Sequence, residues 1–202
     1  ITLSASASAA EGGNITYTAS LDHPAQTPVM VTLSNGATFT IAAGSSSGSV
    51  SVPAPTDDVY VDAGSVSATI ASASGGNFET LVIDPAAAVT SITDTLDITT
   101  VSLTATSSVA EGGNITYTAS LDNPAQTPVT VSLSNGASII IAAGASSGSV
   151  SVAAPADDVH LDAGSVSVSI SSASGGNVEV LEIDPASATT AITDTIDATT
   201  VS

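Results

Sequence analysis

The sequence contains no lysine and no arginine among its 202 residues. It carries 19 aspartates and glutamates and two histidines, so its formal net charge is −19 at pH 7. Nucleic-acid binding requires cationic side chains that replace phosphate counterions, and electrostatic attachment to anionic lipid requires the same groups. We therefore expect no nucleic-acid partner. The acids also lack any lysine or arginine with which to pair.

Cysteine and tryptophan are absent as well, and aromatic residues make up only 2% of the chain. Without cysteine the protein forms neither disulfides nor thiolate metal sites. No segment approaches the run of about 18 apolar residues that a membrane-spanning helix needs, so we expect no direct membrane insertion. A core with so few aromatics, and with alanine at many inward positions, buries little apolar surface. We therefore expect a further source of folding free energy, such as a bound metal.

One sequence unit occurs twice, at an offset of 100 residues. The segment Glu11–Thr18, for example, recurs as Glu111–Thr118. A repeat of about 100 residues is typical of a β-sandwich domain. The expected boundaries are 1–97 for the first domain, 98–200 for the second, and 201–202 for the start of a third copy in a longer array.

Apolar and polar residues alternate with a period of two along most of the chain. Within 15–21, for example, Ile15, Tyr17 and Ala19 alternate with threonines. This pattern is typical of half-buried strands, and helical spacing is missing. It predicts an all-β chain of two tandem immunoglobulin-like β-sandwich domains, end to end. The strands expected in the first copy lie near 1–8, 14–21, 29–34, 37–42, 48–53, 65–73 and 88–93.

Two connections between these strands have recognisable features: one contains a hairpin-turn sequence, and the other is long enough to hold an extra strand. Asn35-Gly36 and its copy Asn135-Gly136 are typical of a two-residue hairpin turn in which both central residues have positive φ. The segment 77–85 is either part of a long connection or an eighth, edge strand closed off by a proline. The sequence leaves these two possibilities open.

The end of the domain at which each acid lies follows from the directions of the strands. If consecutive strands are antiparallel, the first, third and fifth connections and the end of the last strand lie at the same end of the sandwich. We call this end the pole. Six of the nine acids of the first copy fall in these segments, and the second copy repeats them. The candidate metal ligands are Glu11, Asp57, Asp58, Asp62, Asp94 and Asp97, and their equivalents Glu111, Asp157, Asp158, Asp162, Asp194 and Asp197. We expect Glu79 and Glu182 to be solvated.

Ca²⁺ is the ion that suits such a cluster. Like charges held close together must be protonated, separated by solvent or neutralised by a metal. Calcium takes about six to eight hard oxygen ligands in flexible geometry, whereas zinc and copper favour histidine or cysteine. The sequence therefore predicts calcium as the cofactor.

These residues resemble two related families. The motifs are Glu11-Gly12 after the first strand, the Asp57-Asp58 pair with Asp62 four residues on, and Ile92-Thr93-Asp94 with Asp97. They resemble Calx-β calcium domains, although Asp62 stands where that family usually has glutamate. The whole repeat is more similar to the extender repeats of large bacterial biofilm adhesins (LapA-type, repeats-in-toxin adhesins). This resemblance implies type I secretion, an extracellular location on the bacterial cell surface, and many such domains that project a distal ligand-binding region.

Three functions fit these features to different degrees. The favoured function is structural: a calcium-rigidified extender of a giant adhesin in cell attachment and biofilm formation, monomeric, whose partners are neighbouring repeats of the same chain. The alternative is an adhesive module that contacts glycan or protein through its loops, but it would lack the Trp and Arg anchors of most binding surfaces. Ice binding through threonine rows is a weaker idea, because no long threonine ladder occurs.

An enzymatic role is not expected, nor is a small-molecule substrate. The two histidines are not a repeated feature, since His23 aligns with Asn123 and His160 aligns with Tyr60. No nucleophile with a tuned base is specified by the sequence.

Overall fold

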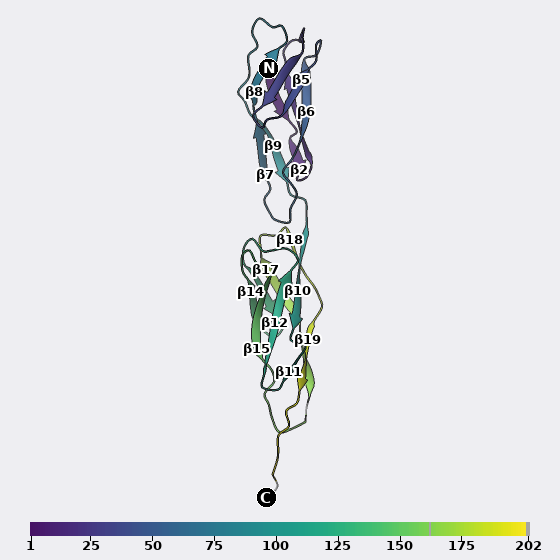
Figure 1. Ribbon diagram of the computed structural model, residues 1–202, viewed down its shortest axis with the longest axis vertical. Coiled ribbons are helices and arrows are strands. Elements are labelled where there is room, and N and C mark those ends of the chain that lie inside the picture. The colour runs from purple at the N-terminus through teal and green to yellow at the C-terminus, as the bar shows by residue number, and fades with distance from the viewer. Residues whose placement is uncertain (162, 201–202) are drawn as a thin grey trace. The chain divides into compact units, whose positions relative to one another are not determined.

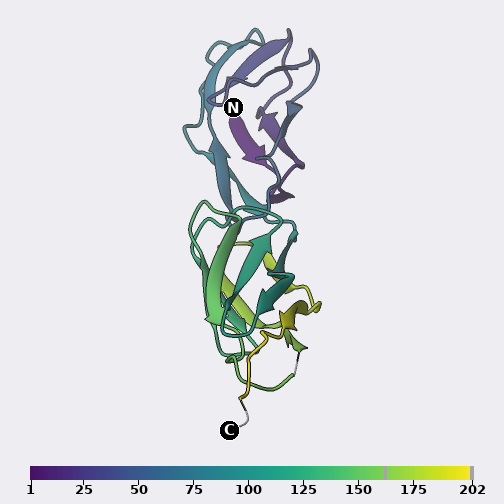
Figure 2. The ribbon, with the colours of Figure 1, turned by 60° about the horizontal axis from the view of Figure 1, so that its bottom comes forward.

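The computed structural model describes residues 1–161 and 163–200, in which every regular element is a strand (Figures 1 and 2). Asp162 and the expected third copy at 201–202 lie outside the described residues. Within the described part of the chain, no helix is long and apolar enough to cross a membrane. The chain divides into two compact units. The first is Ile1–Asp58 with Asp62–Thr95, and the second is Val59–Val61 with Leu96–Ser202.

The first unit is an immunoglobulin-like β-sandwich. Its sheets have the strand orders β1-β3-β6, β2-β9-β7 and β5-β4-β8, and β2 is parallel to β9. The strands are β1 (Thr2–Ala5), β2 (Ser8–Ala10), β3 (Asn14–Ser20), β4 (Val29–Leu33), β5 (Thr38–Ile41), β6 (Ser47–Pro53), β7 (Gly64–Ala68), β8 (Ile70–Gly75) and β9 (Ala88–Thr93). The all-β sandwich predicted from the alternation is thus confirmed.

Two predicted strands are each divided in the structure. The strand expected near 1–8 becomes β1 and β2, which belong to different sheets. The strand expected at 65–73 is interrupted at Thr69, between β7 and β8. There the backbone N–H of Thr69 donates to Ser34 Oγ at 3.0 Å, and the N–H of Ser34 donates to the Thr69 carbonyl at 2.9 Å. These bonds satisfy backbone groups that would otherwise have no partner where the strand changes sheet.

The second unit repeats this sandwich and adds an edge strand. Its sheets have the orders β15-β12-β10-β18, β11-β19-β16 and β14-β13-β17. The strands are β10 (Ile98–Ala105), β11 (Ser108–Ala110), β12 (Asn114–Leu121), β13 (Val129–Leu133), β14 (Ser138–Ile141), β15 (Ser147–Ala153), β16 (Gly164–Val168), β17 (Ile170–Gly175), β18 (Val180–Ile183) and β19 (Ala188–Thr193).

The open question about an eighth strand has a different answer in each unit. In the second unit β18 pairs in parallel with the first four residues of β10. In the first unit β1 begins at Thr2, the position equivalent to Ser102, so it lacks these four residues, and 77–85 forms no strand. The short β18 does not reverse β19, which stays parallel to β11 and antiparallel to β16.

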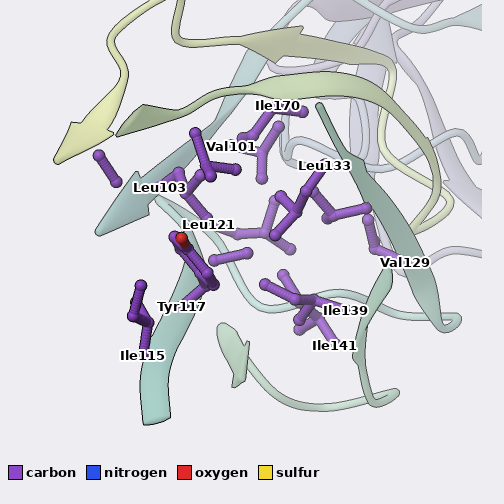
Figure 3. Close-up of a cluster of buried hydrophobic side chains, with 14 of the residues drawn as sticks. Val101, Leu103, Ile115, Tyr117, Leu121, Val129, Leu133, Ile139, Ile141 and Ile170 are labelled. Atoms are coloured by element: carbon purple, nitrogen blue, oxygen red, sulfur yellow. The ribbon is translucent and has the colours of Figure 1, made fainter. Parts of the chain in front are cut away.

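The inward side of the alternation forms one core in each unit. Figure 3 shows the core of the second unit, where Ile115 and Tyr117 of β12 are buried in one cluster with Ile139 and Ile141 of β14. In the first unit several buried positions carry only a methyl group: Ala19, Ala25, Ala54, Ala68 and Ala88. The core is therefore lean, as the composition predicts.

The Asn35-Gly36 hairpin joins β4 and β5 as predicted, but its turn type was predicted wrongly. Only Gly36 has a positive φ, at 86°, while Asn35 does not. The Gly36 N–H donates to the Leu33 carbonyl, and the Leu33 N–H donates to the Ala37 carbonyl. This is the longer hairpin loop in which glycine forms a bulge after an ordinary turn. The Asn35 side chain accepts a hydrogen bond from the Ala37 N–H at 3.1 Å, which explains its preference for this turn.

Candidate calcium site

Backbone hydrogen bonds join three segments at one pole of the first unit. The N–H of Glu11, in the turn after β2, donates to the carbonyl of Thr93 at the end of β9, at 3.1 Å. The N–H of Gly12 donates to the carbonyl of Pro55, which follows β6, at 2.7 Å. The convergence of these segments, predicted from strand parity, is confirmed.

Gly12 allows the turn to approach the loop after β6. It has a φ of 64°, in the left-handed region that residues with a Cβ rarely adopt. A Cβ at this position would lie 3.5 Å from the Cβ of Asp57. The glycine after Glu11 therefore positions the glutamate against the aspartate loop.

Glu11 is the buried acid of this pole. Its side chain is 7% exposed, and its Oε2 has no hydrogen-bond partner among the described residues. Burial raises the pKa of Glu11 to about 7, with further contributions from a hydrogen bond with Asp62 and from the charges of Asp62, Asp94 and Asp58. Four of the predicted ligands, Glu11, Asp58, Asp62 and Asp94, are therefore close enough to interact electrostatically.

Asp57 and Asp94 complete the group in the first unit. Thr95 Oγ1 donates a hydrogen bond to Asp57 Oδ1. Asp94 is partly buried, and its Oδ1 has no hydrogen-bond partner in the described part of the chain. Thr95 was not among the predicted site residues, although the repeated Thr-Asp-Thr of both copies could have indicated it. This threonine ties the chain that leaves β9 to the aspartate loop.

Asp97 belongs to the second unit, unlike the other predicted ligands of its copy. Its backbone N–H donates to Glu179 Oε2 at 2.5 Å. Glu179 is partly buried, and its Oε1 has no hydrogen-bond partner among the residues that the structure describes. Glu179 was not among the predicted site residues, and no local signal separates it from Glu79. Glu79 and Glu182 are exposed, as expected.

The second unit joins the same three segments. The N–H of Glu111 donates to the Thr193 carbonyl at 3.0 Å, and the N–H of Gly112 donates to the Pro155 carbonyl at 2.7 Å. Glu111 is buried, as Glu11 is in the first unit. The site geometry is therefore a property of the repeat rather than of one copy.

The aspartates of the second unit lie along the same segments. Thr195 Oγ1 donates to Asp157 Oδ1, and Asp158 Oδ1 accepts from the His160 N–H at 2.7 Å. A hollow of about 110 Å³ is lined by both acids that follow β19, Asp194 and Asp197, together with residues 159–161 and 195–196. The predicted ligand Asp162 lies outside the described residues.

The donor atoms of these clusters fit calcium. They are carboxylate and hydroxyl oxygens, and the chain has no lysine or arginine to neutralise them. Buried oxygens without a hydrogen-bond partner among the described residues include Glu11 Oε2, Asp94 Oδ1 and Asp194 Oδ1. A buried carboxylate oxygen without a donor is costly, and a hard cation removes that cost.

The raised pKa of Glu11 predicts how the metal-free protein responds to pH. Its ordinary value is 4.5, and its value in the folded protein is about 7. Between these values the folded state holds a proton that the unfolded state has released. The free energy of unfolding in chelator should therefore be higher near pH 4.5 and fall as the pH rises towards 7. Calorimetric Tm values across this range measure the slope.

Glu11→Gln should flatten this dependence, because the amide does not titrate. Glu79→Gln is the matched control: it removes the same charge from an exposed position and should keep the slope of the unsubstituted chain. Equal slopes in the two variants would show that Glu11 does not titrate in this range.

A protein-family model described as the LapA domain matches residues 1–95 and, separately, residues 97–195. Comparison with curated proteins gives no match. The family matches cover nearly the whole sequence and coincide with its internal repeat. The resemblance to LapA-type adhesin repeats, inferred from the motifs around the acids, is confirmed.

Proposed function

Because this chain belongs to the LapA domain family, we propose that it is a calcium-rigidified spacer of a giant bacterial surface adhesin. Family membership indicates an adhesin-related, surface-associated repeat of a structural kind. The spacer role is supported by the two nearly identical copies, which have equivalent loops and the same six candidate ligands. Repeated equivalent surfaces suit a segment that adds length to the adhesin. Other domains, farther from the cell, would carry the ligand-binding surface.

One observation carries the calcium part of the proposal: Asp94, the residue directly after β9, shares one cluster with buried Glu11. The residues that would hold the ion in the first unit are Glu11, Asp57, Asp58, Asp62 and Asp94. Calcium would supply positive charge to this set. The protein supplies the position of the set, through the bonds of Glu11 and Gly12 to neighbouring segments.

For a spacer, the important effect of calcium would be on the segment that connects one domain to the next. Asp94 and Thr95 begin the connection to the next copy, and both are tied to the acids of the pole. With calcium present, this connection would be held against two loops of its own domain. Without calcium, repulsion between the carboxylates would release it.

The difference in calcium concentration between the cytosol and the outside of the cell would determine where the repeats bind calcium. Extracellular calcium modules bind with dissociation constants of about 10⁻⁴–10⁻³ M, well above cytosolic calcium levels. The chain would remain unfolded or loosely folded during type I export and gain its calcium-bound stability outside the cell. This order of events agrees with the absence of cysteine, since no disulfide would be needed.

Small-angle scattering of the two-repeat chain tests the proposal. We expect a stiff particle in calcium and a flexible one in chelator, followed through the maximum dimension and the Kratky plot. Asp94→Asn should keep the flexible behaviour even in calcium, whereas Glu79→Gln, at an exposed site, should behave like the unsubstituted chain. Identical scattering in calcium and in chelator would rule out calcium rigidification.

A further inference from the structure

The first residues of β10 lie between two segments of the second unit. On one side, β18 pairs in parallel with residues 98–101 (Figure 1). On the other side, the N–H of Asp122, directly after β12, donates to the carbonyl of Thr100 at 3.3 Å. Residues 98–100 thus form an inner strand with backbone partners on both sides. We call the space between the end of β12 and β18 the slot of the second unit.

The slot also contacts the side chain of a threonine. Thr99 is completely buried, and the side-chain amide of Asn123 donates to its hydroxyl at 3.3 Å. The carboxylate of Asp122 accepts from the N–H of Thr100 at 3.3 Å. The slot therefore holds an extended segment through its backbone and through one buried hydroxyl.

The first unit has a hollow of about 180 Å³ in the equivalent place. It is lined by Ile1, by residues 21–23, and by residues 78 and 80–82. These positions are equivalent, at the offset of 100, to residues 101, 121–123, 178 and 180–182 of the second unit. The walls of the hollow are therefore the walls of the slot.

Backbone bonds of a parallel pairing are already present at one end of the hollow. The amino group of Ile1 donates to the Val82 carbonyl at 2.6 Å, and the Asp84 N–H donates to the Ile1 carbonyl at 3.0 Å. The second of these bonds has its equivalent in the second unit, also at 3.0 Å. Bonds in a parallel ladder are evenly spaced, so the next two would use the Thr80 carbonyl and the Val82 N–H.

The apolar residues around the hollow are less buried than their equivalents in the slot. Leu121 is only 6% exposed and Val101 is completely buried, whereas Leu21 and Ile1 are both partly exposed. An extended segment in the hollow would cover this apolar surface, as residues 98–100 do in the second unit.

The segment that fits the slot occurs after each copy of the repeat. Ile98-Thr99-Thr100 follows the first copy, and Ala198-Thr199-Thr200 follows the second. Residues 198–200 are exposed and belong to no strand. Each copy therefore has walls that receive such a segment and is itself followed by one.

From these observations we propose that the hollow of the first unit is an acceptor site for strand addition. Its ligand is the connecting segment of another LapA repeat, an extended aliphatic residue followed by two threonines. Recognition by main-chain bonds along a sheet edge is the usual form of strand addition. His23 stands in place of Asn123, and an imidazole N–H can likewise donate to a threonine hydroxyl.

This site requires no metal, because its contacts are made by backbone groups, hydroxyls and apolar side chains. The proposal therefore goes beyond calcium binding and is independent of it. In an array, the residues that connect two repeats would form a strand of the following repeat instead of a flexible linker.

An N-terminal extension tests the acceptor site. The chain is extended before Ile1 by Asp-Ile-Thr-Thr, the sequence of residues 97–100. Amide hydrogen exchange is followed by NMR in saturating calcium. Without the extension the Val82 amide should exchange fast, because Val82 is 69% exposed and belongs to no strand. The extension should slow this exchange about tenfold or more. Glu182, the equivalent residue in β18, is the internal reference and should be protected in both chains.

The matched control is the extension Asp-Ile-Pro-Thr, which differs in one residue. Proline has no N–H and is excluded from inner strands, so the Val82 amide should remain fast. Equal protection by the two extensions, or no slowing by Asp-Ile-Thr-Thr, would overturn the proposal. An unprotected Glu182 amide in a folded chain would also overturn it.

The unextended chain is also measured at a tenfold higher concentration. Protection of Val82 that increases with concentration would assign the hollow to a second copy of the chain and would overturn the proposal. The outcome at Val82 does not depend on calcium rigidification, since scattering can be identical in calcium and in chelator while the extension still protects this amide.

Discussion

Calcium at about one hundred times its dissociation constant is expected to stabilise each repeat by about 2.7 kcal/mol if one ion binds only the folded state. For a domain of about 100 residues this corresponds to a rise in Tm of roughly 10–20 °C. The reason is that the folded pole gathers carboxylates that the unfolded chain keeps apart and solvated. Calorimetry in chelator and at increasing calcium concentrations measures the effect, which should grow with the logarithm of calcium once the site is saturated.

Substitutions at the pole decide whether the stabilisation comes from this cluster. Glu11→Gln and Asp94→Asn should each remove most of the calcium-dependent rise of the first repeat while leaving that of the second. Glu111→Gln and Asp194→Asn should do the reverse. Glu79→Gln, at an exposed position, should change neither. A rise in Tm that survives all four pole substitutions would place calcium elsewhere, and the absence of any rise would refute the site.

The position of this cluster could be predicted from the sequence because the period-two alternation locates the strands. If consecutive strands are antiparallel, the end of the sandwich at which each connection lies follows from counting the strands. Glu11 and Asp57 then fall at one pole without any knowledge of distances. The bonds of Glu11 to Thr93 and of Gly12 to Pro55 confirm this deduction.

Other features depend on tertiary contacts that no local pattern contains. The break at Thr69 arises from its bonds with Ser34, which lies far away in the sequence. The partial burial of Glu179 could not be distinguished from the exposure of Glu79, because the two residues occupy the same place in the repeat.

The second large effect is expected at Gly75, the last residue of β8. Its φ is 106°, and a Cβ there would lie 2.2 Å from the carbonyl oxygen of Pro28. Because that oxygen belongs to the backbone, it cannot move aside as a flexible side chain would. Gly75→Ala should therefore combine an unfavourable φ with a displaced strand, and destabilise the first repeat by about 3 kcal/mol or more. Urea unfolding at saturating calcium measures this loss.

Gly36 provides the matched control, because its φ is 86° but no atom lies within 4 Å of a Cβ built there. Gly36→Ala should cost only the conformational penalty, about 1–2 kcal/mol. The second repeat offers the same pair at Gly175 and Gly136, with a clash at 2.2 Å and open space respectively. Equal losses at Gly75 and Gly36 would mean that β4 yields to the added methyl group. A much larger loss at Gly75 would show that the backbone around the end of β8 is fixed by its close approach to Pro28.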